Sequence, residues 1–173
     1  MEDKISVLIP QEELEARILE MAAQISKDYE GEKLHLVCIL RGSIFFTCEL
    51  AKYITVPVTI DFMSVSSYGD GTESSGRIKI MKDLDDSIKD KNVLVIEDII
   101  DSGHTLSHLL SFLKVREPKS LKLCTLLDKP DRRVVDVHVD YVGREIPYMF
   151  VVGYGLYYAQ KYRNLPYIGV VEL

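Results

Sequence analysis

The chain has 173 residues, of which 47% are hydrophobic and 28% are charged, and its formal net charge is −6. The apolar content is sufficient for a folded core, which argues against a disordered chain, and the length fits one domain. The negative charge argues against a general nucleic-acid binder, because such proteins carry basic surfaces.

The cysteines and the N-terminus indicate the cellular setting. Cys38, Cys48 and Cys124 are widely spaced and form no CxxC pair, so we expect neither a disulfide framework nor a thiolate zinc site. The N-terminus lacks the pattern of a signal peptide, and no apolar run approaches the roughly 18 residues of a membrane span. We therefore expect a cytoplasmic protein with no membrane partner.

Helical and strand patterns alternate along most of the chain. Gln11–Tyr29 has apolar residues at helical spacing and ends before Gly31, as expected of an amphipathic helix. The next expected elements, in order, are a strand over Leu34–Leu40, a helix over Ile44–Tyr53, strands over Val58–Ser66, Ile78–Met81 and Val93–Ile96, a helix carrying Leu106, Leu109, Leu110 and Leu113, and a strand over Leu121–Leu127. Only short strand patterns follow Pro130.

This alternation predicts an α/β fold with a Rossmann-like central parallel sheet flanked by helices. We expect one domain over residues 1–173, with a core over about 30–135. A small hood is expected from the N-terminal segment and residues of about 136–173. Tyr68–Gly76 contains three glycines and predicts a surface loop.

The segment Val93–Leu110 carries the strongest functional signal. An apolar strand ends in the carboxylates Glu97 and Asp98, and the small polar loop Asp101–Thr105 leads into a helix. A helix N-terminus reached through such a loop binds anions, while the acidic side chains suit sugar hydroxyls or a cation. The segment therefore suggests a pocket for a phosphorylated ribose, although an ordinary strand-loop-helix unit remains an alternative at this point.

Three predicted strands end in polar turns, at Arg41–Ser43, at Asp101–Thr105 and at Asp128–Lys129. Ligands of open parallel sheets bind beyond the carboxyl ends of the strands. If these three strands are neighbours, their turns meet at one crevice.

Five motifs, in order along the chain, resemble those of a known family. Residues 93–106, VLVIEDIIDSGHTL, resemble the phosphoribosyl-pyrophosphate (PRPP) motif of type I phosphoribosyltransferases. LRGS at 40–43, SSYG at 66–69, LLDKP at 126–130, and FVVGYGL at 150–156 with YRNLPYIGV at 162–170 resemble hypoxanthine-guanine phosphoribosyltransferases. The resemblance implies purine salvage: transfer of phosphoribose from PRPP to hypoxanthine or guanine with Mg²⁺, by a homodimer or homotetramer.

The resemblance also implies roles for single residues. The 5′-phosphate site comprises Ser102, Gly103, His104 and Thr105. Glu97 and Asp98 face the ribose hydroxyls, directly or through Mg²⁺. Asp101 lies near purine N7 as the general base, although from its position alone it could be the N-cap of the following helix.

On the base side, the resemblance implies that Lys129 donates to purine O6, that Phe150 stacks on the ring, and that Val151 offers backbone groups. Without it, Lys129 would be an ordinary surface lysine and Phe150 a core residue. The pyrophosphate site comprises Arg41, Gly42 and Arg163. The loop expected to close over the site begins at Ser67 and Tyr68.

Tyr157 stands where the family pattern has an aspartate that helps hold Mg²⁺ on the pyrophosphate side. A neutral phenol is a poor ligand for Mg²⁺, which prefers hard, charged or water oxygens. We therefore expect a weakened second Mg²⁺ site and reduced turnover.

Two other functions compete with this interpretation. One is a regulator on the same fold that binds PRPP or nucleotide and controls nucleic acid, which the net charge disfavours. The other is an α/β enzyme acting on a different phosphorylated sugar, with an accidental match of motifs.

Overall fold

The computed structural model describes residues 3–67 and 77–172. Its elements are β1 (Lys4–Ile9), α1 (Gln11–Asp28), β2 (Leu34–Leu40), α2 (Ile44–Tyr53), β3 (Val58–Ser67), β4 (Ile78–Lys82), β5 (Asn92–Ile100), α3 (His104–Lys114), β6 (Ser120–Asp128), the 3₁₀ turn η1 (Pro130–Arg132), β7 (Tyr141–Glu145), β8 (Val151–Val152) and β9 (Ile168–Glu172). Tyr68 and the rest of the loop expected over 68–76 lie outside the described residues.

The central sheet has the strand order β4-β3-β2-β5-β6-β7. Its strands run parallel except β4, which pairs antiparallel with β3 at one edge. β2 and the first part of β5 are almost continuously apolar, because both faces of a central parallel strand are covered. The predicted α/β fold with a central, mostly parallel sheet is confirmed.

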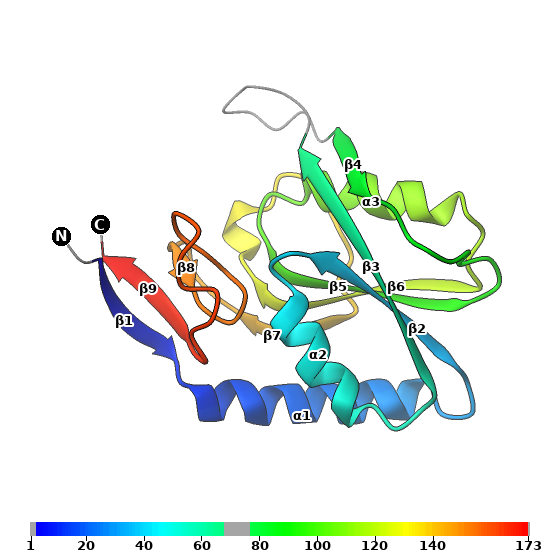
Figure 1. The fold of residues 1–173 in the computed structure, drawn as a ribbon, viewed down its shortest axis with the longest axis horizontal. Helices are drawn as coiled ribbons and strands as arrows, with labels where there is room; N and C mark the ends of the chain where they lie inside the picture. Colours follow the sequence, from blue (N-terminus) through cyan, green and yellow to red (C-terminus); the bar gives the residue numbers. More distant parts are fainter. Residues whose placement is uncertain (1–2, 68–76, 173) are drawn as a thin grey trace.

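Helices cover both faces of this sheet (Figure 1). Leu36 and Leu94 point to the face that packs against α1 and α2. Val37 and Val95, one position along each strand, point to the face that packs against α3, as the alternation of side chains along a strand requires. Among the described residues, no helix combines the length and apolar character needed to cross a lipid bilayer.

A second, three-stranded sheet has the order β1-β9-β8 and joins the two ends of the chain. In Figure 1, β1 and β9 lie side by side at one end of the molecule. Sequence analysis did not predict β1, whose mostly exposed residues show no clear alternation. The expected boundary of the hood was also wrong in one respect, because β7 pairs with β6 and so belongs to the central sheet.

A buried carboxylate fastens the connection between β4 and β5 to the sheet. Asp61 in β3 is 3% exposed. Its Oδ2 accepts the backbone N–H groups of Asp85 and Asp86 at 2.9 and 3.1 Å, and its Oδ1 accepts that of Phe62 at 2.8 Å. Burial raises the pKa of Asp61, but these three hydrogen bonds together hold it below its usual value.

We predict that Asp61→Asn lowers the free energy of unfolding at pH 7 by about 1–3 kcal/mol, because an amide cannot accept all three hydrogen bonds. The depressed pKa makes the ionised carboxylate stabilising above the unfolded-state pKa of about 3.9, and this contribution is lost as the pH falls through the folded-state value. Urea unfolding from pH 7 downward should show a constant difference from the unsubstituted protein that shrinks below about pH 4.

Asp85→Asn is the matched control, since the Asp85 side chain is exposed and, within the described residues, pairs only with Lys82 at 3.2 Å. It should leave stability nearly unchanged. An equal loss in both variants would contradict the role given to Asp61.

Candidate functional site

Three loops meet at one edge of the central sheet. β2, β5 and β6 are neighbours and run parallel, so their carboxyl ends lie side by side. The backbone N–H of Lys129 donates to the carbonyl of Ile100 at 3.0 Å, which joins the loop after β6 to the loop after β5. The arrangement expected for the three polar turns is therefore present.

The loop after β5 leads directly into the N-terminus of α3. Gly103 precedes the helix with φ +89°, and a Cβ there would lie 2.7 Å from the carbonyl oxygen of Val135. Only glycine fits this position, because it combines a left-handed backbone with close packing. The N-cap residue is Gly103, so Asp101 is not the N-cap. The backbone N–H of His104 donates to the Ser102 hydroxyl in a long hydrogen bond of 3.4 Å. The N–H groups that follow His104 at the start of α3 remain available for an anion.

Ser67, the last residue of β3, lies beside this loop. Its hydroxyl is 3.2 Å from that of Thr105. The structure thus places the end of β3 next to the predicted phosphate site.

Glu97 and Asp98 lie next to each other near the end of β5. Burial raises the pKa of Glu97 well above its usual value, the negative charge of Asp98 raises it further, and no described cation offsets the shift. Burial also raises the pKa of Asp98, although the backbone N–H of Ile99 opposes the shift. Hydroxyl donors or a hard cation would stabilise the ionised pair, so the pair fits both a sugar diol and Mg²⁺.

A metal at this position would rely on the substrate for further ligands. Among the described residues, no group of three or more acidic, histidine or cysteine side chains could hold a metal ion. Two carboxylates with substrate phosphates and water are the usual setting of a protein-bound Mg²⁺.

The turn after β2 packs tightly against the rest of the site. A Cβ at Gly42 would lie 1.8 Å from Oδ2 of Asp98, and one at Gly155 would lie 1.9 Å from the carbonyl oxygen of Gly42. The peptide bond between Leu40 and Arg41 is cis. Nη1 of Arg163 donates to the carbonyl of Gly155 at 2.6 Å. Gly42 and Arg163, both predicted for pyrophosphate, therefore border one small region beside Asp98.

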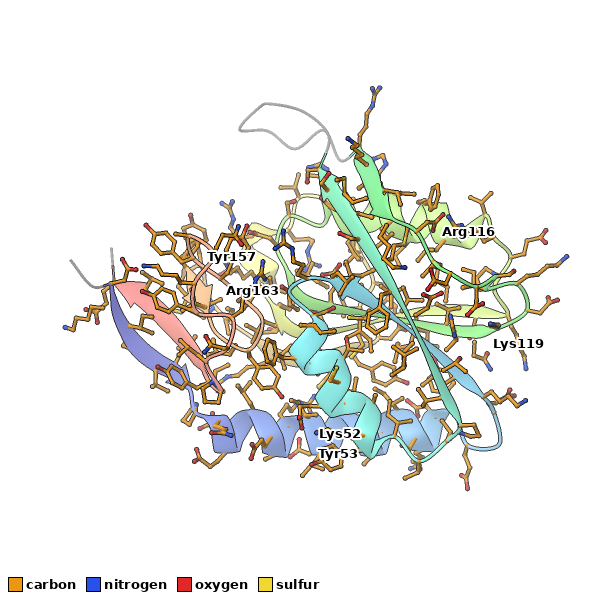
Figure 2. All side chains as sticks on the ribbon, viewed as in Figure 1. Lys52, Tyr53, Arg116, Lys119, Tyr157 and Arg163 are labelled. Atoms are coloured by element: carbon orange, nitrogen blue, oxygen red, sulfur yellow. The ribbon has the colours of Figure 1, made fainter. Side chains whose placement is uncertain are left out.

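Tyr157 lies on Arg163 (Figure 2). The guanidinium carbon is 4.1 Å from the centroid of the phenol ring, a close cation–π contact.

Two of the residues predicted to bind the purine differ in burial from what is usual for their residue types. Lys129 is 8% exposed, so it is not an ordinary surface lysine, and its ammonium lies 5.9 Å from the ring centroid of Tyr148. Phe150 is 46% exposed, so it is not a core residue, and its ring meets Tyr158 edge-on with centroids 5.5 Å apart. Val151 is buried in β8. A buried cation and an exposed aromatic ring both suit contact with a ligand.

Two arginines that sequence analysis did not single out contact Asp101. Nε of Arg132 lies 3.1 Å from Oδ1 of Asp101. Arg133 forms an ion pair with Asp128, and its Nε donates to the backbone carbonyl of Asp101 at 3.3 Å. In the sequence, the one sign of a role for these arginines was their position shortly after Lys129, at the end of the strand β6.

Comparison with known proteins supports an enzyme. Residues 8–159 match the family described as "Phosphoribosyl transferase domain". A curated hypoxanthine phosphoribosyltransferase of Salmonella typhimurium is 53% identical, covering 100% of this chain and 98% of the relative. A hypoxanthine-guanine phosphoribosyltransferase of Streptococcus thermophilus is 49% identical over 96% of this chain and 92% of its own length.

Solved structures agree with these relatives. A crystal structure of a hypoxanthine-guanine phosphoribosyltransferase from Bacillus anthracis, with a HEPES molecule in its active site, superposes with a TM-score of 0.95. It is 50% identical and covers 99% of this chain and 100% of that chain.

These matches extend far beyond the motif after β5, so the match of motifs is not accidental. They also give no support to a regulator on the same fold, because the matched relatives are named as transferases. The chain therefore belongs to the phosphoribosyltransferase family, within which it is similar to hypoxanthine and hypoxanthine-guanine phosphoribosyltransferases.

Proposed function

We propose that this protein is a purine salvage enzyme that transfers the 5-phosphoribosyl group from PRPP to hypoxanthine or guanine and releases pyrophosphate. The observation that carries the proposal is the meeting of the start of α3, the Glu97–Asp98 pair and the Asp101 carboxylate at the carboxyl end of β5, beside the ends of the parallel strands β2 and β6. Relatives about half identical to this chain and named for the same activity support it.

The loop after β5 would bind the ribose phosphate. Backbone N–H groups of Ser102 to Thr105 and the Thr105 hydroxyl would hold the 5′-phosphate, since a helix N-terminus directs its N–H groups at an anion. Glu97 and Asp98 would accept hydrogen bonds from the ribose hydroxyls.

The purine would lie between the loops after β5 and β6 and the residues of β8. Lys129 has donors but no acceptor, so it would favour a 6-oxo group over a 6-amino group. Phe150 would stack on the ring, and the backbone of Val151 would meet its edge. As N9 bonds to C1′, the C1′–oxygen bond breaks, pyrophosphate leaves with the electron pair, and the proton on N7 passes to Asp101.

Other residues would bind the leaving pyrophosphate and exclude water from the site. Arg41, the Gly42 backbone and Arg163 would bind pyrophosphate, because guanidinium groups match phosphate oxygens. The segment beginning at Ser67 and Tyr68 would close over the site and exclude the water that would otherwise hydrolyse PRPP.

Mg²⁺ would be held by Glu97 and Asp98 together with oxygens of PRPP. When bound, it would neutralise charge on the pyrophosphate group. The three free thiols Cys38, Cys48 and Cys124 support a reducing, cytoplasmic setting. Assembly as a homodimer or homotetramer stays a prediction from the family resemblance.

The proposal predicts purine-dependent release of pyrophosphate from PRPP with hypoxanthine or guanine, and little with adenine. Asp101→Asn should lower kcat by about 10²–10⁴-fold with little effect on either KM, because it removes the proton acceptor but preserves shape. A spectrophotometric assay of nucleotide formation measures the dependence on the purine, the kcat and the two KM values. Asp136→Asn, an exposed acidic position outside the site, is the control. Full kcat in Asp101→Asn would refute the assignment of the base.

Lys129→Ala should raise the KM for the purine about tenfold or more and leave the KM for PRPP unchanged, because a charged hydrogen bond to O6 is lost. Lys114→Ala, at the exposed end of α3, should match the unsubstituted protein. A change in the KM for PRPP alone would contradict the placement of Lys129 beside the purine.

Tyr157→Asp should raise kcat and lower the Mg²⁺ concentration required, because a carboxylate can ligate a hard cation where a neutral phenol cannot. Titration of Mg²⁺ with PRPP by calorimetry should show tighter binding in the variant. Tyr53→Asp is a matched control, since Tyr53 is 47% and Tyr157 44% exposed and Tyr53 lies at the end of α2 (Figure 2). Equal rates and equal Mg²⁺ dependence would rule the idea out.

A further inference from the structure

The side chain of Arg132 links the proposed base to an exposed aromatic ring. Its Nε lies 3.1 Å from Oδ1 of Asp101, and its guanidinium carbon lies 4.7 Å from the ring centroid of Tyr148. The side chains of Arg132 and Asp101 are 49% and 52% exposed. Ion pairs as exposed as this contribute little to folding, so stability alone gives no reason for the arrangement.

Arg132 contacts one of the two carboxylate oxygens of Asp101 and leaves the other free. Arg132 binds Oδ1, whereas Oδ2 of Asp101 accepts no hydrogen bond from the part of the chain that the structure describes. Arg133 holds the backbone carbonyl of the same residue through its Nε at 3.3 Å. Two consecutive arginines thus restrain Asp101 at its backbone and at one carboxylate oxygen, and the second oxygen remains open.

The segment that carries these arginines is itself fixed to the loop it restrains. The backbone N–H groups of Val134 and Val135 both donate to the carbonyl of Ser102, at 2.9 and 3.1 Å. The backbone of Lys129 donates to Ile100 at 3.0 Å. Residues on both sides of η1 are therefore anchored to the loop containing Asp101, which limits how far Arg132 can move relative to the carboxylate.

The exposed ring of Tyr148 packs against the guanidinium of Arg132. It is 68% exposed, and its ring lies near two cations, the guanidinium of Arg132 and the ammonium of Lys129 at 5.9 Å. A ring face attracts a flat guanidinium and restricts its rotation. An exposed tyrosine in this place has no role in the core.

We propose that Arg132, stacked on Tyr148, is a positioning residue that holds Asp101 in one rotamer with Oδ2 free to receive the purine proton. The inference rests on the proposed function. Arg132 and Asp101 are both half exposed, so water screens the charge of Arg132. The useful effect is therefore orientation, since small misplacements of a catalytic group reduce rates strongly.

Three variants test this by steady-state kinetics. Arg132→Gln should lower kcat about tenfold and leave both KM values within about twofold, because the carboxylate loses its fixed geometry but the substrates still bind. Tyr148→Leu should lower kcat in the same way by a smaller factor. Tyr148→Phe keeps the ring and should behave like the unsubstituted protein.

Double-mutant cycles separate positioning from other effects. If Arg132 acts through Asp101, Arg132→Gln should cause no further loss of kcat in an Asp101→Asn background, and Tyr148→Leu should cause none in an Arg132→Gln background. Arg132→Lys, which keeps a donor and a charge, should recover part of the lost kcat. Thermal unfolding of each variant confirms that it is folded.

Two results would overturn the inference alone: an active protein whose kcat is unchanged by Arg132→Gln, or a loss in that variant that persists in full when Asp101 is replaced. Absence of purine-dependent pyrophosphate release in the unsubstituted protein would overturn the proposed function, and this inference with it.

Discussion

The parallel pairing of β2, β5 and β6 as neighbours is the constraint on which the whole site depends. It carries three short loops to one edge of the sheet, where glycines allow their backbones to approach closely. Gly42 leaves room for Asp98, Gly155 for Gly42, and Gly103 for the backbone of Val135. A side chain at any of these positions would push apart the groups that the chemistry needs together.

Much of this arrangement could be predicted because it depends on strong local patterns. The apolar runs of β2 and β5, the helical spacing in α1 and the polar turn before α3 are each set by neighbouring residues. The features that escaped prediction, the strand β1 and the place of β7 in the central sheet, depend on distant partners instead. β1 forms because it pairs with β9 at the other end of the chain, and β7 joins the central sheet through β6.

Burial of single site residues could not be predicted from their types. Lys129 is buried and Phe150 is exposed, the reverse of their usual behaviour, because the three loops and β8 together build the surroundings of each. The contacts of Arg132 with Asp101 and Tyr148, and of Tyr157 with Arg163, likewise join segments that are separate in the chain. Such contacts leave no periodic pattern for sequence analysis to find.

The central claim is that one crevice binds a ribose 5-phosphate at the start of α3, with its hydroxyl groups facing Glu97 and Asp98. A crystal structure of the protein with PRPP and Mg²⁺ tests this most directly. We predict density for the 5′-phosphate within hydrogen-bonding distance of the backbone N–H groups of Ser102 to Thr105, and the ribose diol beside the two carboxylates. PRPP bound elsewhere on the protein, with nothing bound beside Thr105, would contradict the account.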